Sequence, residues 1–228
     1  MSGDVDVQTI HDKPCVPDEV KLLELPEGHE LLSDEPARSS LVYEPALRYV
    51  LGRVPSKRAI RELRIGACLE GRFAGRVILP VYDTKNVLRW YVGRSWKKKA
   101  KMPYLYPRGA RDGVVFNEAA LDVETDSPAL IVEGMFDAYA LWPHAVAVLG
   151  KTTDTHLARF RKAKRPIVLV PDGDAYVEGL AQMQRLRMAG IRAGLIKLPP
   201  RKDPDEMVEL VLQAAPLAVN AGRYVEIE

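Results

Sequence analysis

The sequence predicts an α/β protein in which a parallel sheet flanked by helices follows a smaller, basic α+β subdomain. From residue 128 onward, short apolar runs alternate with helix-like segments, which is typical of parallel sheets covered on both faces. Upstream, β-branched and aromatic runs are separated by a turn, as in a β-hairpin. Between residues 48 and 111 there are 17 Lys/Arg against 3 Asp/Glu, whereas the rest of the chain holds 16 against 28. A basic half therefore adjoins an acidic half.

Residues 1–40 are expected to form a partly ordered N-terminal arm. Pro, Glu, Asp and Ser dominate this segment and no clean hydrophobic period emerges. One short helix or strand is expected around residues 20–25.

The basic subdomain is predicted to span residues 41–125 and to open with two short helices. Pro45 suits the first turn of a helix and Gly52 suits its end. Ser56 is expected to cap the second helix. The hairpin strands are predicted at residues 77–82 and 87–92. A basic loop with interleaved tyrosines, KKKAKMPYLYPRG, follows them, and then a strand at GVVF, residues 113–116.

The α/β domain is predicted to span residues 126–215, followed by a tail at residues 216–228. Its strands are expected in ALIVEG, AVAVLG, PIVLVPD and RAGLIKLP. Helices are expected in MFDAYALW, TDTHLARFRKA, AYVEGLAQMQRLRMAG and DPDEMVELVLQA. In such sheets the functional groups lie beyond the carboxyl ends of the strands.

Acidic residues follow three of the predicted strands. Glu133 ends the first strand, Asp172 and Asp174 end the third, and Asp203 and Asp205 lie just beyond the fourth. Asp137, on the first turn of the first helix, is expected on the same side. Clustered carboxylates repel one another unless a cation lies among them. Oxygen ligands without histidine favour Mg²⁺ or Mn²⁺, and two such ions suit phosphoryl or nucleotidyl transfer.

Each aspartate also has a purely structural explanation. Asp203 and Asp205 are common types at a helix N-terminus, where the helix dipole favours them, and Asp172 is a common turn residue. Glu133 has no evident structural role between a buried strand and Gly134. Gly173 is expected to let the backbone bend so that Asp172 and Asp174 point the same way.

Other features limit the function. No apolar run approaches the roughly 20 residues of a transmembrane helix, and the polar N-terminus is unlike a secretory signal. Two distant cysteines, Cys15 and Cys68, provide neither a disulfide framework nor a zinc ribbon. We therefore expect neither zinc nor a membrane partner. We expect a cytoplasmic location. The basic half suggests a polyanionic partner, a nucleic acid or nucleotide, although a solvated basic surface would have the same composition.

Four stretches, IVEGMFDAYAL, AVLGKTTDTHLARF, IVLVPDGDAYVEGLAQ and IKLPPRKDPDEMV, resemble the Toprim domain of DnaG-type bacterial and phage primases. The upstream ALRYVLGRVPSKRAIRELRIGAC and GRVILPVYDTKNVLRWYVGRSW resemble the N-terminal catalytic subdomain of those primases. The resemblance covers about residues 41–215. It implies catalytic roles for Glu133, Asp172 and Asp174, with Glu133 as acid/base. The implied metal ligands are Glu133, Asp137, Asp172, Asp174, Asp203 and Asp205, and the implied template or nucleotide contacts are Arg64, Arg94, Lys99 and Lys101.

The resemblance implies a DNA-dependent RNA primase core that uses Mg²⁺, a single-stranded DNA template and ribonucleoside triphosphates. The zinc-binding and helicase-binding modules of the family are not expected in this chain. A minimal phage or mobile-element core is therefore expected, with a helicase or a zinc-module protein of the primosome acting in trans. Two alternatives remain open: a magnesium-dependent Toprim nuclease, and a non-catalytic replisome adaptor that binds single strands. Tyr176 stands where the family usually has a smaller residue.

Overall fold

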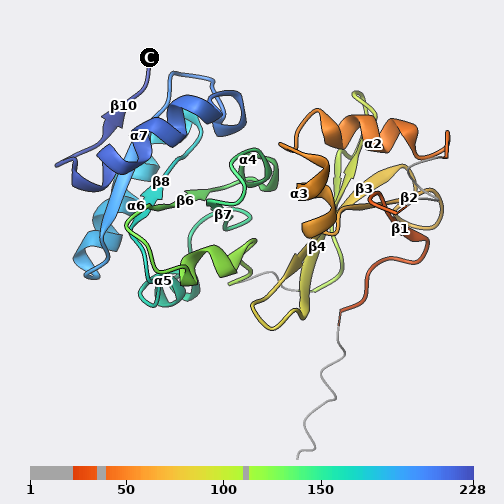
Figure 1. Ribbon diagram of the computed structural model, residues 1–228, viewed down its shortest axis with the longest axis horizontal. Helices are drawn as coiled ribbons and strands as arrows, with labels where there is room; N and C mark the ends of the chain where they lie inside the picture. The colour runs from red at the N-terminus through yellow and green to blue at the C-terminus, as the bar shows by residue number, and fades with distance from the viewer. Residues whose placement is uncertain (1–22, 35–39, 110–112) are drawn as a thin grey trace, which may run out of the picture.

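The expected hairpin forms the centre of the first of two five-stranded sheets (Figure 1). The computed structural model describes residues 23–34, 40–109 and 113–228. The first sheet is antiparallel and has the order β1-β2-β3-β4-β5. Its strands are β1 (His29–Leu31), β2 (Gly66–Cys68), β3 (Arg76–Tyr82), β4 (Leu88–Ser95) and β5 (Tyr104–Leu105). This sheet and helices α2 (Glu44–Leu51) and α3 (Lys57–Glu62) make up the first lobe.

Side-chain hydrogen bonds fix the local geometry of this lobe. Asp83 Oδ1 accepts from the backbone N–H groups of Lys85 and Val87, both at 2.9 Å, which closes the hairpin turn. Asn86 in this turn has a φ of 63°, which Asn tolerates better than most residues. Ser56 Oγ accepts from Ala59 N at 3.1 Å, so its predicted role as a helix cap is confirmed.

Both faces of β4 are covered. Trp90 and its neighbour Tyr91 point to opposite sides of the sheet, yet they are only 4% and 5% exposed. Trp90 belongs to the largest apolar cluster, and Tyr91 packs with Cys68 and Phe73 in a smaller one. Neither ring is therefore available to stack on a nucleic acid base.

The second lobe contains the expected alternation of strands and helices. Its sheet is parallel, with the order β10-β9-β8-β6-β7. Its strands are β6 (Ala129–Val132), β7 (Ala145–Ala147), β8 (Ile167–Leu169), β9 (Ala193–Lys197) and β10 (Val225–Glu226). Its α-helices are α4 (Met135–Ala140), α5 (Asp154–Phe160), α6 (Tyr176–Met188) and α7 (Val208–Asn220), and its 3₁₀ turns are η1 (Glu118–Asp122), η2 (Gly173–Ala175) and η3 (Pro204–Glu206).

Several expected boundaries differ from the structure. Strand β1 comes from the segment expected to be an arm, and the described part of residues 20–25 holds no helix or strand. Residues 113–116 form no strand, and only Phe116 makes a bridge, antiparallel to Ala147. The expected tail is also structured, because α7 continues through Pro216 to Asn220 and β10 extends the sheet. Cys15 and most of the expected arm lie outside the described residues.

One apolar cluster joins the two lobes. It includes Leu79 and Val92 of the first sheet together with Phe116 and Tyr139 of the second lobe. Across the same boundary, the Tyr49 ring meets the Phe136 ring edge-on, with centroids 5.9 Å apart. The apolar contact between the lobes is continuous, so their facing surfaces are held together. Among the described residues, no helix has both the length and the apolar character needed to cross a bilayer.

Arg165 anchors the segment that leads into β6. Arg165 is 8% exposed, and its guanidinium donates to the backbone carbonyls of Ala120, Ser127 and Pro128 at 3.2, 2.7 and 3.0 Å. Replacing it (Arg165→Met) is expected to lower the free energy of unfolding by about 3 kcal/mol, because the buried carbonyls lose their donors. Urea denaturation measures the effect. The exposed Arg192→Met is the control, and equal losses for the two variants would contradict this role for Arg165.

A candidate active site between the two lobes

The carboxyl ends of three adjacent strands carry the acidic residues. Glu133 follows β6 directly, Asp172 comes three residues after β8, and Asp203 lies in the loop after β9. Because these strands are neighbours in the order β9-β8-β6, their ends meet at one edge of the sheet. The prediction that the three acidic segments gather there is therefore confirmed.

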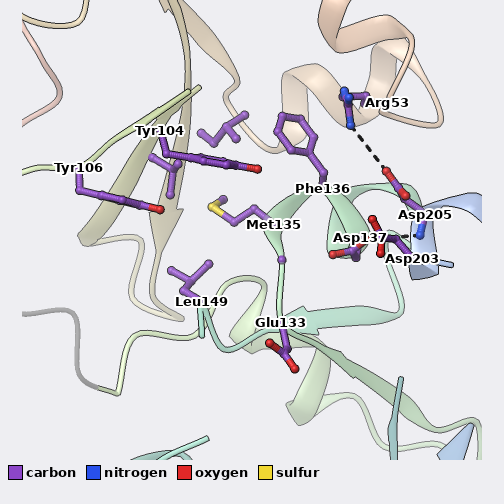
Figure 2. Close-up of a pocket in the computed structure, with 13 residues that line it drawn as sticks. Arg53, Tyr104, Tyr106, Glu133, Met135, Phe136, Asp137, Leu149, Asp203 and Asp205 are labelled. Atoms are coloured by element: carbon purple, nitrogen blue, oxygen red, sulfur yellow. Dashed lines mark hydrogen bonds and ion pairs between the residues drawn. The ribbon is translucent and has the colours of Figure 1, made fainter. Parts of the chain in front are cut away.

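The acids line two adjoining cavities. The first, the inter-lobe cavity, has a volume of about 230 Å³ and is lined by residues of both lobes (Figure 2). It includes Glu133, Asp137, Asp203 and Asp205 of the second lobe and Arg53, Tyr104 and Tyr106 of the first. A second cavity of about 280 Å³ is lined by Asp172, Asp174, Glu178, Arg201 and Asp203. Asp203 lines both cavities, so the acids form one continuous region.

Burial and mutual repulsion make this region unfavourable for negative charge. The pKa of Asp137 is raised to about 7, first by burial and then by Asp205 and Asp172. The pKa of Asp172 is raised by burial and by Asp203, and that of Glu133 by burial and then by Asp172 and Glu178. A bound cation would relieve these costs.

All of the candidate ligands are carboxylates, which is the ligand type that a hard divalent cation prefers. Over the ranges that the structure describes, no three His, Cys, Asp or Glu side chains are already arranged as a metal-ligand set. Two of the acids also have structural roles. The Asp203 side chain caps η3 in a reciprocal arrangement with Glu206, and Asp137 Oδ1 accepts weakly from Asp205 N at 3.4 Å. Ion binding would require the carboxylates to turn toward one point.

The loop that carries Asp172 and Asp174 is held against the loop that follows β9. Gly173 N donates to Lys202 O at 2.8 Å, and Arg201 N donates to Asp174 Oδ1 at 3.1 Å. The φ of Gly173 lies outside the left-handed region, so backbone strain is not what requires a glycine here. A Cβ at this position would lie 1.9 Å from Pro199 O. Glycine is needed here because two backbone segments approach closely.

Arg53 is a site residue that the sequence did not single out. Its guanidinium lies 3.7 Å from Asp205 Oδ2 and packs over the rings of Tyr49 and Phe136, 5.1 and 5.0 Å from their centroids. It directly follows Gly52, whose only visible role in the sequence was to end a helix. No spacing in the sequence connects Arg53 to the acids. Its position depends on how the lobes meet.

The four basic residues expected at the site lie on the first lobe but not together. Arg94 donates to Tyr49 Oη at 3.0 Å and stacks on Tyr104, 4.3 Å from its centroid, beside the inter-lobe cavity. Arg64 instead packs over Tyr82 at 4.6 Å. Lys99 and Lys101 are exposed on the basic loop. Of the four, only Arg94 contacts a residue that lines the cavity.

Tyr176, the residue larger than expected, is fixed by the C-terminal strand region. Its ring meets Tyr224 edge-on at 5.1 Å, and Lys197 Nζ lies 5.2 Å from its centroid. Lys197 also pairs with Glu226 of β10 at 2.6 Å. These contacts tie the start of α6, directly after Asp174, to the edge of the sheet.

Comparisons with known proteins agree on one architecture. The catalytic core of DnaG superposes with a TM-score of 0.63 at 22% identity, covering 77% of this chain and 71% of that core. The E. coli primase catalytic core gives a TM-score of 0.61 at 21% identity, covering 81% and 74%. The chain has the fold of a DnaG-type primase catalytic core. A DnaG primase catalytic domain bound to single-stranded DNA also matches, with a TM-score of 0.62, 22% identity and coverage of 81% and 78%.

Two curated sequences are similar to this chain. A DNA primase of Legionella pneumophila is 28% identical over 172 residues, which is 64% of this chain and 30% of that protein. A DNA primase of Clostridium acetobutylicum is 32% identical over 152 residues, which is 60% and 25%. The aligned segments thus cover between a quarter and a third of the length of these relatives. No protein-family model matches the sequence.

Proposed function

We propose that this chain is a DNA primase core, a nucleotidyltransferase that synthesises short RNA primers on a single-stranded DNA template. One observation carries the proposal. Carboxylates gather at the ends of three adjacent strands, and those that follow β6 and β9 share a cavity with the basic lobe, in the fold of the DnaG catalytic core. The relatives named DNA primase support the same reaction.

The proposed reaction joins two nucleotides. The 3′-hydroxyl oxygen of one nucleotide attacks the α-phosphorus of a ribonucleoside triphosphate. A new P–O ester bond forms, the bond between the α- and β-phosphates breaks, and pyrophosphate leaves. Glu133 is proposed to accept the hydroxyl proton. Burial and its acidic neighbours raise the pKa of Glu133, which makes it a better proton acceptor than an ordinary glutamate.

The acids of the site, Glu133 among them, are proposed to hold two Mg²⁺ or Mn²⁺ ions. The ligands would be drawn from Glu133, Asp137, Asp172, Asp174, Asp203 and Asp205. When bound, such ions neutralise charge on the attacking and leaving oxygens. Arg53, beside Asp205, is placed to meet the phosphates that come with the ions.

Template DNA is proposed to bind the basic lobe, with Arg64, Arg94, Lys99 and Lys101 contacting phosphates or nucleotides. Affinity should then fall steeply with salt, because phosphate contacts release counterions. We further propose that the protein serves phage or mobile-element replication in a bacterial cytoplasm. A helicase or a zinc-module protein would supply start-site selection in trans.

Removing either aspartate of the loop after β8 tests the mechanism. Asp172→Ala and Asp174→Ala are each expected to abolish dinucleotide synthesis, since they remove proposed ion ligands, while binding to single-stranded DNA stays within about twofold. The assay follows ribonucleotide incorporation on a mixed-sequence template with Mg²⁺, with and without the partner replication proteins. Asp126→Asn, a fully exposed aspartate, is the control.

Three results would contradict this proposal in different ways. Synthesis at the wild-type rate by either alanine variant would overturn the role of the acids. Shortened template or RNA with Mg²⁺ would indicate a Toprim nuclease instead. DNA binding with no metal-dependent reaction in any mixture would indicate a non-catalytic adaptor.

A further inference from the structure

We propose that Tyr104 and Tyr106 form a stacking platform for the base of the nucleoside triphosphate, opposite the acids of the inter-lobe cavity. The inference rests on the proposed function and adds to it the binding site for the base. Both tyrosines line the same cavity as Glu133 and Asp205. The platform and the acids therefore face one shared cavity.

The geometry of the tyrosine pair suits a flat aromatic ligand. The two ring planes lie within 6° of each other and their centroids are 6.4 Å apart. Figure 2 shows the rings edge-on and parallel, with both hydroxyl groups on the side where Met135 and Phe136 lie. The rings are the side chains of residues i and i+2 in an extended segment, so both project from the same side of the chain. Their orientation is thus set by the backbone.

Neighbouring groups hold the platform in place. The Arg94 guanidinium lies 4.3 Å from the centroid of Tyr104, and Arg94 is itself fixed by Tyr49 Oη. Arg72 donates to the backbone carbonyl of Tyr106 at 3.0 Å. A rigid aromatic pair loses little conformational freedom when a base stacks on it. Yet the residues remain accessible, since Tyr104 is 43% exposed and Tyr106 is 38% exposed.

The charges in the cavity favour a nucleotide over template DNA. Aspartates and Glu133 line the wall beyond the tyrosines, and they would repel a phosphodiester chain that arrives without cations. A nucleoside triphosphate bound with divalent ions is complementary to both the tyrosine wall and the acidic wall of the cavity. Its base would lie on the tyrosines, and its triphosphate would lie among the ions and beside Arg53. Met135 and Leu149 provide an apolar floor between them.

The test compares a ligand that has a base with one that lacks it. Binding of ATP and of inorganic triphosphate to the full chain is measured by titration calorimetry with Mg²⁺. Tyr106→Ala and Tyr104→Ala are each expected to weaken ATP roughly 5- to 100-fold, the range for loss of one base–aromatic contact. Affinity for inorganic triphosphate should not change. Tyr106→Phe should keep wild-type ATP affinity, because stacking needs the ring and not the hydroxyl.

Further controls separate the alternatives. Met102→Ala, an exposed neighbour on the same loop that does not line the cavity, should leave both affinities unchanged. Equal losses of ATP and inorganic triphosphate would overturn the inference, as would unchanged ATP binding. A selective loss of single-stranded DNA affinity, measured by anisotropy without Mg²⁺, would also overturn it by assigning the rings to the template. If the wild type binds neither phosphate ligand, the proposed function itself fails. If the wild type binds ATP and the two tyrosine-to-alanine variants bind it equally well, only the stacking platform is overturned and the proposed function stands.

Discussion

Replacing Gly173 with alanine is expected to reduce primer synthesis at least about 100-fold, because displacing catalytic groups by about an ångström has effects of that size. The added Cβ would lie 1.9 Å from Pro199 O and 2.9 Å from Pro199 C. These are backbone atoms, so no side-chain rotation relieves the clash. The loop must move, and the hydrogen bond from Gly173 N to Lys202 O is lost or lengthened. Asp172 and Asp174 then separate from Asp203.

The same substitution is expected to lower the free energy of unfolding by about 2 to 3 kcal/mol, as for other overpacked sites. Thermal and urea denaturation measure this effect, and primer synthesis is assayed in parallel. Gly222→Ala is the matched control, since a Cβ there meets nothing within 4 Å and its φ is not left-handed. Normal synthesis by Gly173→Ala would show that the contact between the two loops is dispensable.

Asp137→Asn is expected to abolish synthesis and yet stabilise the metal-free protein near neutral pH. Burial, followed by Asp205 and Asp172, raises the pKa of Asp137 from 3.8 to about 7. Above that pH the folded protein holds a poorly solvated charge that the unfolded chain carries at little cost. Removing the charge should increase the free energy of unfolding by about 2 kcal/mol at roughly pH 8. This value is smaller than the free energy that corresponds to the whole pKa shift. The Asp137 side chain is only partly buried, so solvent screens part of its charge.

The sign of the pH dependence follows from the raised pKa. Below the ordinary pKa of 3.8, Asp137 is protonated in both states and the variant gains nothing. As pH rises through about 7, the wild type loses stability that the asparagine variant keeps. Denaturation of both proteins across this range, without divalent ions, measures the difference.

Added Mg²⁺ should make the wild type more stable than Asp137→Asn, the reverse of the order expected without divalent ions. It would stabilise the wild type by occupying the acidic region, whereas Asp137→Asn would respond weakly because it lacks one proposed ligand. Asp126→Asn, with its fully exposed side chain, should show neither effect. A variant that responds to Mg²⁺ as the wild type does would remove Asp137 from the ligand set.

Local sequence patterns determined the strands and helices and the residues that end them. Apolar runs of four to six residues predicted β6, β7, β8 and β9, because a buried parallel strand needs apolar side chains on both faces. Since parallel strands present their carboxyl ends at one edge, Glu133, Asp172 and Asp203 could be placed together before any coordinates were known. The resemblance to DnaG-type primases rested on the same short segments, and the fold agrees with it.

Only the tertiary structure decided which distant residues complete the site. Arg53 reaches Asp205, and Tyr104 and Tyr106 face the acids, because the two lobes dock through a shared apolar cluster. Gly173 is required by a neighbouring backbone segment 26 residues further along the chain, at Pro199. β10 forms because the edge of β9 offers it unpaired backbone groups, although two residues carry no periodic signal. The spacing of apolar residues along the sequence reflects which side of a helix or strand is buried. How the lobes and loops pack against one another depends on surface shapes that exist only in the folded chain.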